Sequence, residues 1–249
     1  MIVIEELRKT FKGQKVLDGV NLKIPTGKTT VIIGPSGTGK SVLLKTIVRL
    51  IQPDSGRILV NDINILEQGE AAVNQVRKRC GMCFQDAALF DSMSVGENVA
   101  FPLRMHTELQ DGEIAERVAE LLKVVGLAGI EEKLPSQLSG GMRKRVGIAR
   151  AMALNPRYMF FDEPTTGLDP IMSNAINTLI AKVQVHTNAT SLVISHDIAG
   201  AYAIADHMAM IYRGKIIMEG PPDDFKACDD ALVRQFLEGR IEGPINTVF

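Results

Sequence analysis

Strand-like and helix-like patterns alternate along much of the chain. The run Thr30-Val-Ile-Ile33 is typical of a strand that is buried on both faces of a parallel sheet. A glycine-rich turn follows it, and residues 41–50 have a helical pattern. Strand-like runs return at 158–161 and 191–194, with a helix predicted over 171–185 between them. This alternation predicts an α/β fold with a parallel sheet.

Other patterns lie around this alternation. Short strand-like runs occur at 2–4, 16–24 and 57–60, and residues 207–219 have the pattern of a hairpin that turns at Arg213-Gly214. Between about 87 and 155 the pattern is helical throughout. Because this block interrupts the alternation of strands and helices, we expect it to form an inserted helical subdomain.

Turn and capping residues divide the helical block. Ser94 and Glu97 have the spacing of a capping box and predict the start of a helix, which we expect to end near Pro102. Asp111 is expected to cap the next helix, and Gly126 to end it.

Composition indicates a globular protein without a membrane segment of its own. The 249 residues include 28 Lys and Arg against 29 Asp and Glu, a net charge of -1 that gives no general attraction to nucleic acid or anionic membranes. No stretch approaches the roughly 20 apolar residues of a membrane span, and the N-terminus does not resemble a signal peptide. We therefore expect a soluble, cytoplasmic-type protein that reaches a membrane only through a partner.

Cys80 and Cys83 form a C-x-x-C pair, which raises the possibility of a zinc or redox site. On the short strand predicted there, an offset of three places the two thiols on opposite faces. A tetrahedral metal site also needs two further ligands, and no second pair is present. Buried structural cysteines are the better interpretation.

A phosphate-binding loop lies between the first buried strand and the helix after it. The pattern G-x-x-x-x-G-K-[ST] is met by the consecutive residues Gly34, Pro35, Ser36, Gly37, Thr38, Gly39, Lys40 and Ser41. Glycines let successive N–H groups turn inward around an anion, and the helix N-terminus adds its positive dipole. Lys40 is expected to reach the terminal phosphates, and the Ser41 hydroxyl to bind Mg²⁺. The sequence therefore predicts a nucleoside triphosphate site.

Two carboxylates end the strand-like run at 158–161. Asp162 is placed to hold the Mg²⁺ shell, and Glu163 is a candidate general base that deprotonates water for attack on the γ-phosphate. The plainer alternative for Glu163 is a charge at a helix entry before Pro164.

With these motifs the chain resembles the ATP-binding-cassette (ABC) transporter ATPases, over about residues 1–222. The remaining marks of that family occur in family order: Gln85, Leu138-Ser139-Gly140-Gly141, Gly167-Leu168-Asp169 and Ser195-His196-Asp197. The resemblance implies a P-loop NTPase (ABC ATPase) fold with an antiparallel β subdomain and an inserted helical subdomain. Residues 1–85 and 156–222 would form the nucleotide-binding core with the β subdomain, 86–155 the helical subdomain, and 223–249 a C-terminal tail.

The resemblance also implies roles for single residues. Gln85 would contact Mg²⁺ and water, and His196 would hold the γ-phosphate. The Ser139 loop, with Gly140 and Gly141, would bind the γ-phosphate of ATP on a second chain, with Asp169 at the seam of that head-to-tail dimer. Phe11 occupies the place where the family stacks an aromatic ring on adenine. Taken singly, Ser139 is also a good N-cap, His196 a plausible strand end and Phe11 a plausible core residue.

Finer features resemble the Mla branch of the family, which powers phospholipid traffic between the membranes of Gram-negative envelopes. They include Met142 where glutamine is usual, together with the segments 88–90, 97–104 and 167–171. This resemblance implies a permease dimer, an MCE-domain lipid-binding subunit and a STAS-domain subunit, at the cytoplasmic face of the inner membrane. The surface over 86–104 would be the permease docking groove.

Other functions remain open from the motifs alone. The ATPase of an amino-acid or metal importer would share every catalytic motif. An ABC protein acting on DNA or ribosomes is disfavoured, since there is no second cassette or coiled-coil insertion, and so is a regulatory module that does not hydrolyse ATP. The basic run 143–145 is interpreted as a solvated helix face, not as a nucleic-acid site.

The tail carries one apolar helical face, made by Leu232, Val233, Phe236 and Leu237, and Gly239 is expected to end that helix. Further apolar residues follow at Ile241, Ile245, Val248 and Phe249. A poorly ordered end is one interpretation. Our hypothesis is that the tail docks on the second ATPase chain or the STAS subunit.

Overall fold

The computed structural model describes residues 1–245, which divide into two compact units. The first unit contains Met1–Gln68 and the chain from Ile194 onward, and the second contains Gly69–Val193. The three-part division given above stays a prediction. Of the helices in the described residues, none combines the length and apolar character that crossing a bilayer requires.

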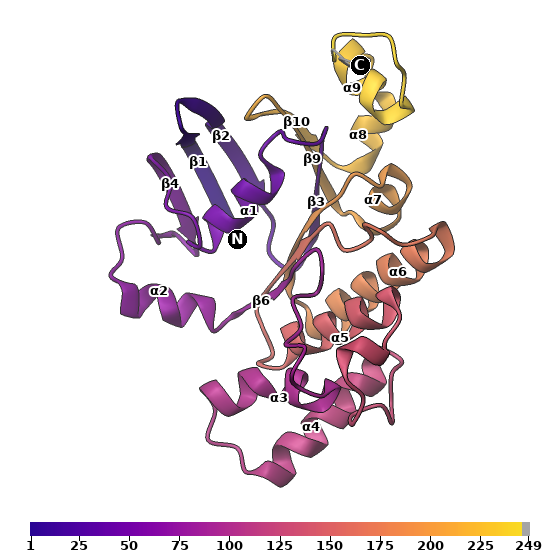
Figure 1. Ribbon diagram of the computed structural model, residues 1–249. Helices are drawn as coiled ribbons and strands as arrows, with labels where there is room; N and C mark the ends of the chain where they lie inside the picture. The colour runs from indigo at the N-terminus through magenta and orange to yellow at the C-terminus, as the bar shows by residue number, and fades with distance from the viewer. Residues whose placement is uncertain (246–249) are drawn as a thin grey trace. The chain divides into compact units, whose positions relative to one another are not determined.

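The first unit contains an antiparallel sheet of four strands in the order β2-β1-β4-β5. Its strands are β1 (Ile2–Phe11), β2 (Gln14–Ile24), β4 (Ser55–Val60) and β5 (Ile63–Asn64), drawn in indigo to purple in Figure 1. Ile2 pairs with both Ile24 and Val60, and all three side chains are buried. The alternation of buried and exposed residues along β2 is that of a sheet with one covered face.

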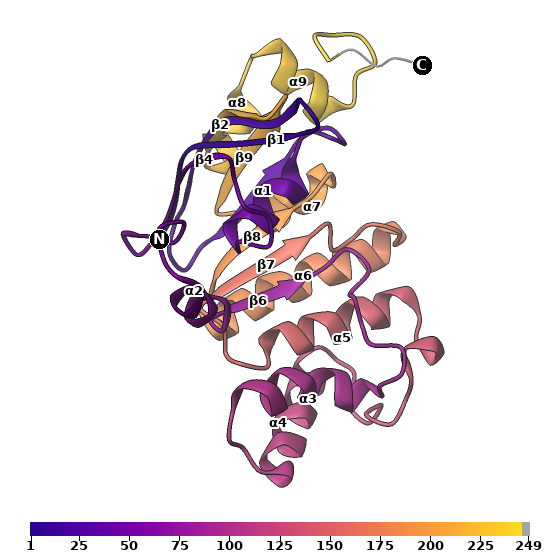
Figure 2. The same ribbon diagram turned by 60° about the vertical axis from the view of Figure 1, so that its left-hand side comes forward.

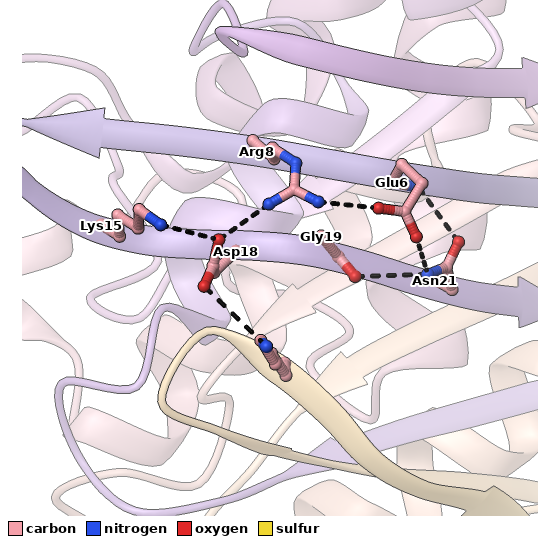
Figure 3. A network of polar contacts seen from close by, with 7 residues as sticks. Glu6, Arg8, Lys15, Asp18, Gly19 and Asn21 are labelled. Carbon is pink, nitrogen blue, oxygen red and sulfur yellow. Dashed lines mark hydrogen bonds and ion pairs between the residues drawn. The ribbon is translucent and has the colours of Figure 1, made fainter.

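A polar network covers the outer side of the β1–β2 pair (Figure 3). The register shifts near Glu6, whose φ is 48° and whose N–H donates to Asn21 Oδ1 at 3.0 Å. The Arg8 guanidinium bridges Glu6 and Asp18, with both distances 2.8 Å, and Lys215 lies 4.0 Å from Asp18. Exposed pairs of this kind contribute about 1 kcal/mol or less each, so the network mainly fixes register.

Three further strands belong to the first unit. They are β3 (Thr29–Ile33), β9 (His207–Tyr212) and β10 (Lys215–Gly220). β3 is entirely buried and pairs in parallel with β9, and β9 pairs with β10 through the predicted turn at Arg213-Gly214. The helices of this unit are α1 (Lys40–Ile47), α7 (Ile198–Ile204), α8 (Pro222–Ala227) and α9 (Ala231–Glu238).

The second unit combines strands with a helical block. Its strands are β6 (Cys80–Cys83), β7 (Tyr158–Asp162) and β8 (Thr190–Ile194), whose last residue falls in the first unit. Figure 2 shows β6 beside β7, with which it pairs in parallel. Helices α2 (Glu70–Arg77) and α6 (Pro170–Thr187) accompany the strands, and the helical block contains α3 (Val95–His106), α4 (Asp111–Val124), a 3₁₀ turn (Pro135–Gln137) and α5 (Gly140–Met152).

Capping at α3 follows the sequence prediction, whereas its end does not. Ser94 and Glu97 form a reciprocal capping box. The expectation that this helix ends near Pro102 is wrong, because α3 continues to His106. Val99 and Leu103 are buried on either side of the proline, and α3 packs on α4 and α5. Packing of this face outweighs the backbone hydrogen bond that proline removes.

The start of α4 also differs from the prediction by one residue. Gln110, not Asp111, is the N-cap, and its N–H donates to Glu113 Oε2 at 2.8 Å. Gly126 ends the helix with a φ of 71°, as expected.

Candidate functional site

In the first unit, the phosphate loop is held in place by close approaches of its glycines to neighbouring backbone. It follows the buried strand β3 directly, and Gly34, Gly37 and Gly39 all have positive φ. A Cβ on Gly34 would lie 2.3 Å from the carbonyl oxygen of Ile211, and one on Gly39 would lie 2.7 Å from that of Val16. Side chains at these two positions are therefore excluded both by space and by backbone conformation.

Lys40 is buried at the base of this loop, with 4% of its surface exposed. Its ammonium donates to the carbonyl oxygens of Gly34 at 2.8 Å and Pro35 at 2.9 Å. Thr38 Oγ1 donates to the same Pro35 oxygen at 2.8 Å. The loop thus holds a positive charge at the N-terminus of α1, an arrangement that suits a phosphate group.

Phe11 lies at the end of β1 and is 42% exposed, so it is a surface aromatic and not a core residue. The Lys9 ammonium lies 5.2 Å from the centre of its ring. Asp54 accepts hydrogen bonds from Lys9 at 2.8 Å and from the Thr10 N–H at 2.6 Å, which fixes the end of the strand.

His196 also belongs to the first unit and is exposed. The residues on either side of it are held firmly. The Ser195 N–H donates to Ile32 O at 3.1 Å, and Asp197 caps α7 by accepting from the Gly200 N–H at 2.9 Å. The imidazole therefore projects from a short, well-anchored link.

In the second unit, the carboxylates follow the fully buried strand β7. Asp162 is its last residue and is 4% exposed. Glu163 has a φ of 48°, and its Oε2 accepts from the Thr166 hydroxyl at 3.0 Å. A left-handed conformation costs a non-glycine residue on the order of 1 kcal/mol, and it turns Glu163 away from the strand direction.

Ser139 and Asp169 both cap helices of the second unit. Ser139 Oγ accepts from the Met142 N–H at 3.3 Å, and Asp169 Oδ1 accepts from the N–H groups of Ile171 and Met172 at 2.9 Å each. The structure thus shows the plainer role of Ser139 as an N-cap. Its role toward a second chain stays a prediction.

A cavity of about 220 Å³ brings three predicted segments of the second unit together. It is lined by residues after Gln85, by the start of α5 and by the loop before Asp169: Asp86, Ala87, Gly140, Arg143, Lys144, Thr166, Gly167 and Leu168. A Cβ on Gly141 would lie 2.5 Å from Met172 Cε, so the start of α5 also lies close to α6.

The sequence suggested that the basic run 143–145 is a solvated helix face. Lys144 shows that this interpretation does not hold for the whole run. Only 6% of Lys144 is exposed, and its ammonium donates to the carbonyl oxygen of Gln85. Arg150 donates from the same helix to Ala87 O and Ala88 O. Lys144 and Arg150 are six residues apart, which places them about 120° from each other around a helix, so helical periodicity in the sequence does not mark them as a pair.

Cys80 and Cys83 are both free thiols. Burial raises the pKa of Cys83 to about 11 and that of Cys80 to about 12. Within residues 1–245 there is no group of three or more His, Cys, Asp and Glu side chains that suits a metal ion. Cys83 is buried, as expected, whereas Cys80 is partly exposed. Thiols that stay protonated are poor metal ligands and poor nucleophiles.

Residues 17–166 match the ABC transporter family model. The chain is 43% identical to the intermembrane phospholipid transport system ATP-binding protein MlaF of Haemophilus influenzae, over 98% of this chain and 93% of that protein. It is 42% identical to the probable ribonucleotide transport ATP-binding protein Mkl of Mycobacterium leprae, over 98% of this chain and 70% of that protein.

Solved structures are similar as well. The dimeric, ADP- and Pi-bound post-hydrolysis state of the ATP-binding cassette MJ0796 matches with a TM-score of 0.82 and 31% identity, over 89% of this chain and 98% of that one. The CbiO1 protein of Clostridium perfringens, part of an ABC transporter complex, matches with a TM-score of 0.83 and 31% identity, over 96% and 95%.

The raised pKa of Cys83 predicts a pH-dependent contribution to stability. Above about pH 8.5 the thiol ionises in the unfolded chain but stays protonated in the folded one, so its contribution to stability is lost as pH rises toward 11. The free energy of unfolding of the wild type, relative to Cys83→Ala, should fall by about 2 kcal/mol between pH 7 and pH 10. Urea denaturation at several pH values measures this difference, and a difference that is constant with pH would contradict it.

Proposed function

The chain belongs to the ABC transporter family, and we propose that its ATP hydrolysis powers phospholipid traffic between the membranes of a bacterial envelope. The observation that carries this proposal is the 43% identity to the phospholipid transport protein of Haemophilus influenzae. That similarity runs over nearly the whole of both chains, whereas the ribonucleotide transport relative extends well beyond the part that this chain matches.

Nucleotide binding is assigned to the first unit. The phosphate loop residues 34–41 would surround the phosphates of ATP, with Lys40 as the positive charge, and Phe11 would stack on the adenine ring. His196, exposed on its anchored link, would donate to the γ-phosphate. The positive φ values of the loop glycines and the burial of Lys40 support this assignment.

Hydrolysis is assigned to Glu163, acting on a water molecule oriented with the help of Gln85. Ser41, Gln85 and Asp162 would hold Mg²⁺, and their hydroxyl, amide and carboxylate oxygens are the donor types that Mg²⁺ prefers. When bound, the ion would neutralise charge on the phosphates. Glu163 is held by Thr166, and its carboxylate would accept the proton of the water as general base.

A second copy of the chain would complete each ATP site. Ser139, Gly140 and Gly141 would contact the γ-phosphate bound by the partner copy, and Asp169 would lie at the seam. Two observations support this arrangement. The start of α5 lines the same cavity as the loop before Asp169, and the similar MJ0796 cassette is dimeric.

A membrane permease would dock on the second unit, within the predicted surface 86–104. A largely apolar groove of about 310 Å³ lies there, lined among others by Phe84, Phe90, Phe101 and Leu154. The rings of Phe90 and Phe101 lie 4.9 Å apart, and Phe90 remains 42% exposed. The chain would thus lie at the cytoplasmic face of the inner membrane, with MCE-domain and STAS-domain subunits completing the assembly.

The tail would bind the second ATPase chain or the STAS subunit. Helix α9 ends at Gly239 as predicted, and the buried Gln235 side chain bonds the backbone of Ile241 and Ile245. Ile241 is 70% exposed, and an apolar group of this kind suits a partner surface. Val248 and Phe249, which the sequence also assigned to this surface, lie outside the described residues.

Truncation after Gly239 should leave nucleotide binding unchanged, because the phosphate loop and Phe11 are retained. Recovery of the second ATPase chain or the STAS subunit with the truncated protein should fall severalfold, as measured by quantitative co-purification from membranes. The full-length chain is the control, and equal recovery of both partners would refute the proposed role of the tail.

Replacing Glu163 by Gln should separate binding from hydrolysis. Phosphate release by the assembled complex should fall by a factor of about 100 or more, since the general base is lost, while ATP affinity stays within about threefold. Movement of labelled phospholipid between vesicles should fall in parallel. Glu116→Gln, on an exposed position of α4, is the matched control. An unchanged rate of phosphate release would remove Glu163 from its proposed role.

A further inference from the structure

The segment that carries Gln85 is fastened to helix α5 by side chains that the family motifs do not include. The Lys144 ammonium donates to Gln85 O, and the Arg150 guanidinium donates to Ala87 O at 2.6 Å and to Ala88 O at 2.8 Å. All of these residues belong to the second unit. Two cations of α5 therefore hold three carbonyl groups within four consecutive residues.

Close packing lies between the two cations. Gly147 is midway between Lys144 and Arg150 on α5, and a Cβ placed there would lie 3.0 Å from the Cβ of Ala87. Ala87 is fully buried. Contact between the helix and the 85–88 segment thus involves both hydrogen bonds and direct packing.

The backbone of the segment has a conformation that requires such support. Ala87 and Ala88 have φ values of 61° and 49°, in the left-handed region, which is unfavourable for alanine because its Cβ crowds the backbone. This conformation persists only where the surroundings stabilise it. The carbonyl groups of these two residues are the ones that Arg150 binds.

Burial of Lys144 makes its contact costly to break, whereas Arg150 is only partly buried. Desolvation lowers the pKa of both Lys144 and Arg150 below their ordinary values; Cys83 opposes this effect at both residues, and Asp86 and Glu163 oppose it at Lys144. A buried cation that lost its carbonyl partners would be left uncompensated. The segment and the helix are therefore expected to stay together when other parts of the molecule move.

Helix α5 also connects this contact to two other places. Its N-cap is Ser139, so the signature loop, residues Ser139–Gly141, forms its first turn. Near its other end, Arg150 lines the apolar groove and lies 5.9 Å from the centre of the Phe90 ring. An occupant of the groove would therefore touch the residue that holds Ala87 and Ala88.

We propose that Lys144 and Arg150 are positioning residues that clamp Gln85 to α5, so that Gln85 and the Ser139–Gly141 loop are displaced together when the groove is occupied. The proposal rests on the function assigned above to Gln85 and to the signature loop. Lys144 and Arg150 act through Gln85 and touch no substrate.

The test is a double-mutant cycle in the assembled complex. Lys144→Met keeps the aliphatic stem but loses the donor, and it should lower kcat about tenfold with the KM for ATP changed less than about twofold. Lys144→Arg, which retains a donor, should restore at least half of the activity. In a Gln85→Ala background, Lys144→Met should change kcat less than about twofold. Lys123→Met, at an exposed position of α4, is the control.

A second readout does not depend on catalysis. The Ala87 N–H donates to Phe84 O at 2.9 Å, and its hydrogen exchange should speed up about tenfold or more in Lys144→Met and, to a smaller extent, in Arg150→Lys. Arg150→Lys keeps the charge and provides a second variant if Lys144→Met does not fold.

Two results would overturn the clamp. The first is that Lys144→Met lowers kcat by the same factor with Gln85 present as in the Gln85→Ala background. The second is an unchanged rate of hydrogen exchange at the Ala87 N–H. Failure of the proposed function is distinguishable, because it would show as normal hydrolysis in Glu163→Gln whatever the exchange rates are.

Discussion

Strands buried on both faces determine where polar chemistry is located in this protein. Every residue of β3, β7 and β8 is buried, and among these residues the only charged side chain, Asp162, lies where its strand ends. The phosphate loop follows β3, Asp162 is the last residue of β7, and His196 comes two residues after β8. This pattern is typical of α/β proteins, in which ligands bind beyond the carboxyl ends of the strands.

Helix α5 has a comparable role within the second unit. It begins at the signature loop and carries the buried Lys144 and the partly exposed Arg150, and both bind a segment about 60 residues earlier in the chain. The carbonyl groups of residues 85, 87 and 88 accept hydrogen bonds from these cations and, at the buried Lys144, take the place of water. Helix α5 thereby carries or binds three parts of the molecule. The signature loop is assigned to a second chain, Gln85 to the reacting water, and the apolar groove lined by Arg150 to a permease.

The sequence predicted features whose cause is local. The phosphate loop needs glycines at positive φ beside a lysine, and the Ser94–Glu97 box and the Arg213-Gly214 turn depend on neighbours a few residues apart. Features with a distant cause were missed. Pro102 lies inside α3 because the helix packs on both sides of it, and Lys144 is buried because it binds a carbonyl group 59 residues away. The roles predicted for the site residues depend on a nucleotide and on a second chain. Because the fold of one chain contains neither, these roles stay predictions.

The subunit and lipid composition of the native assembly tests the central claim most directly. The complex that contains this chain would be purified from the membranes of its own organism, and its proteins and bound lipids identified by mass spectrometry. The account predicts a permease, an MCE-domain subunit, a STAS-domain subunit and phospholipid. Recovery of a periplasmic amino-acid-binding protein in place of the MCE-domain subunit, with no bound phospholipid, would contradict it.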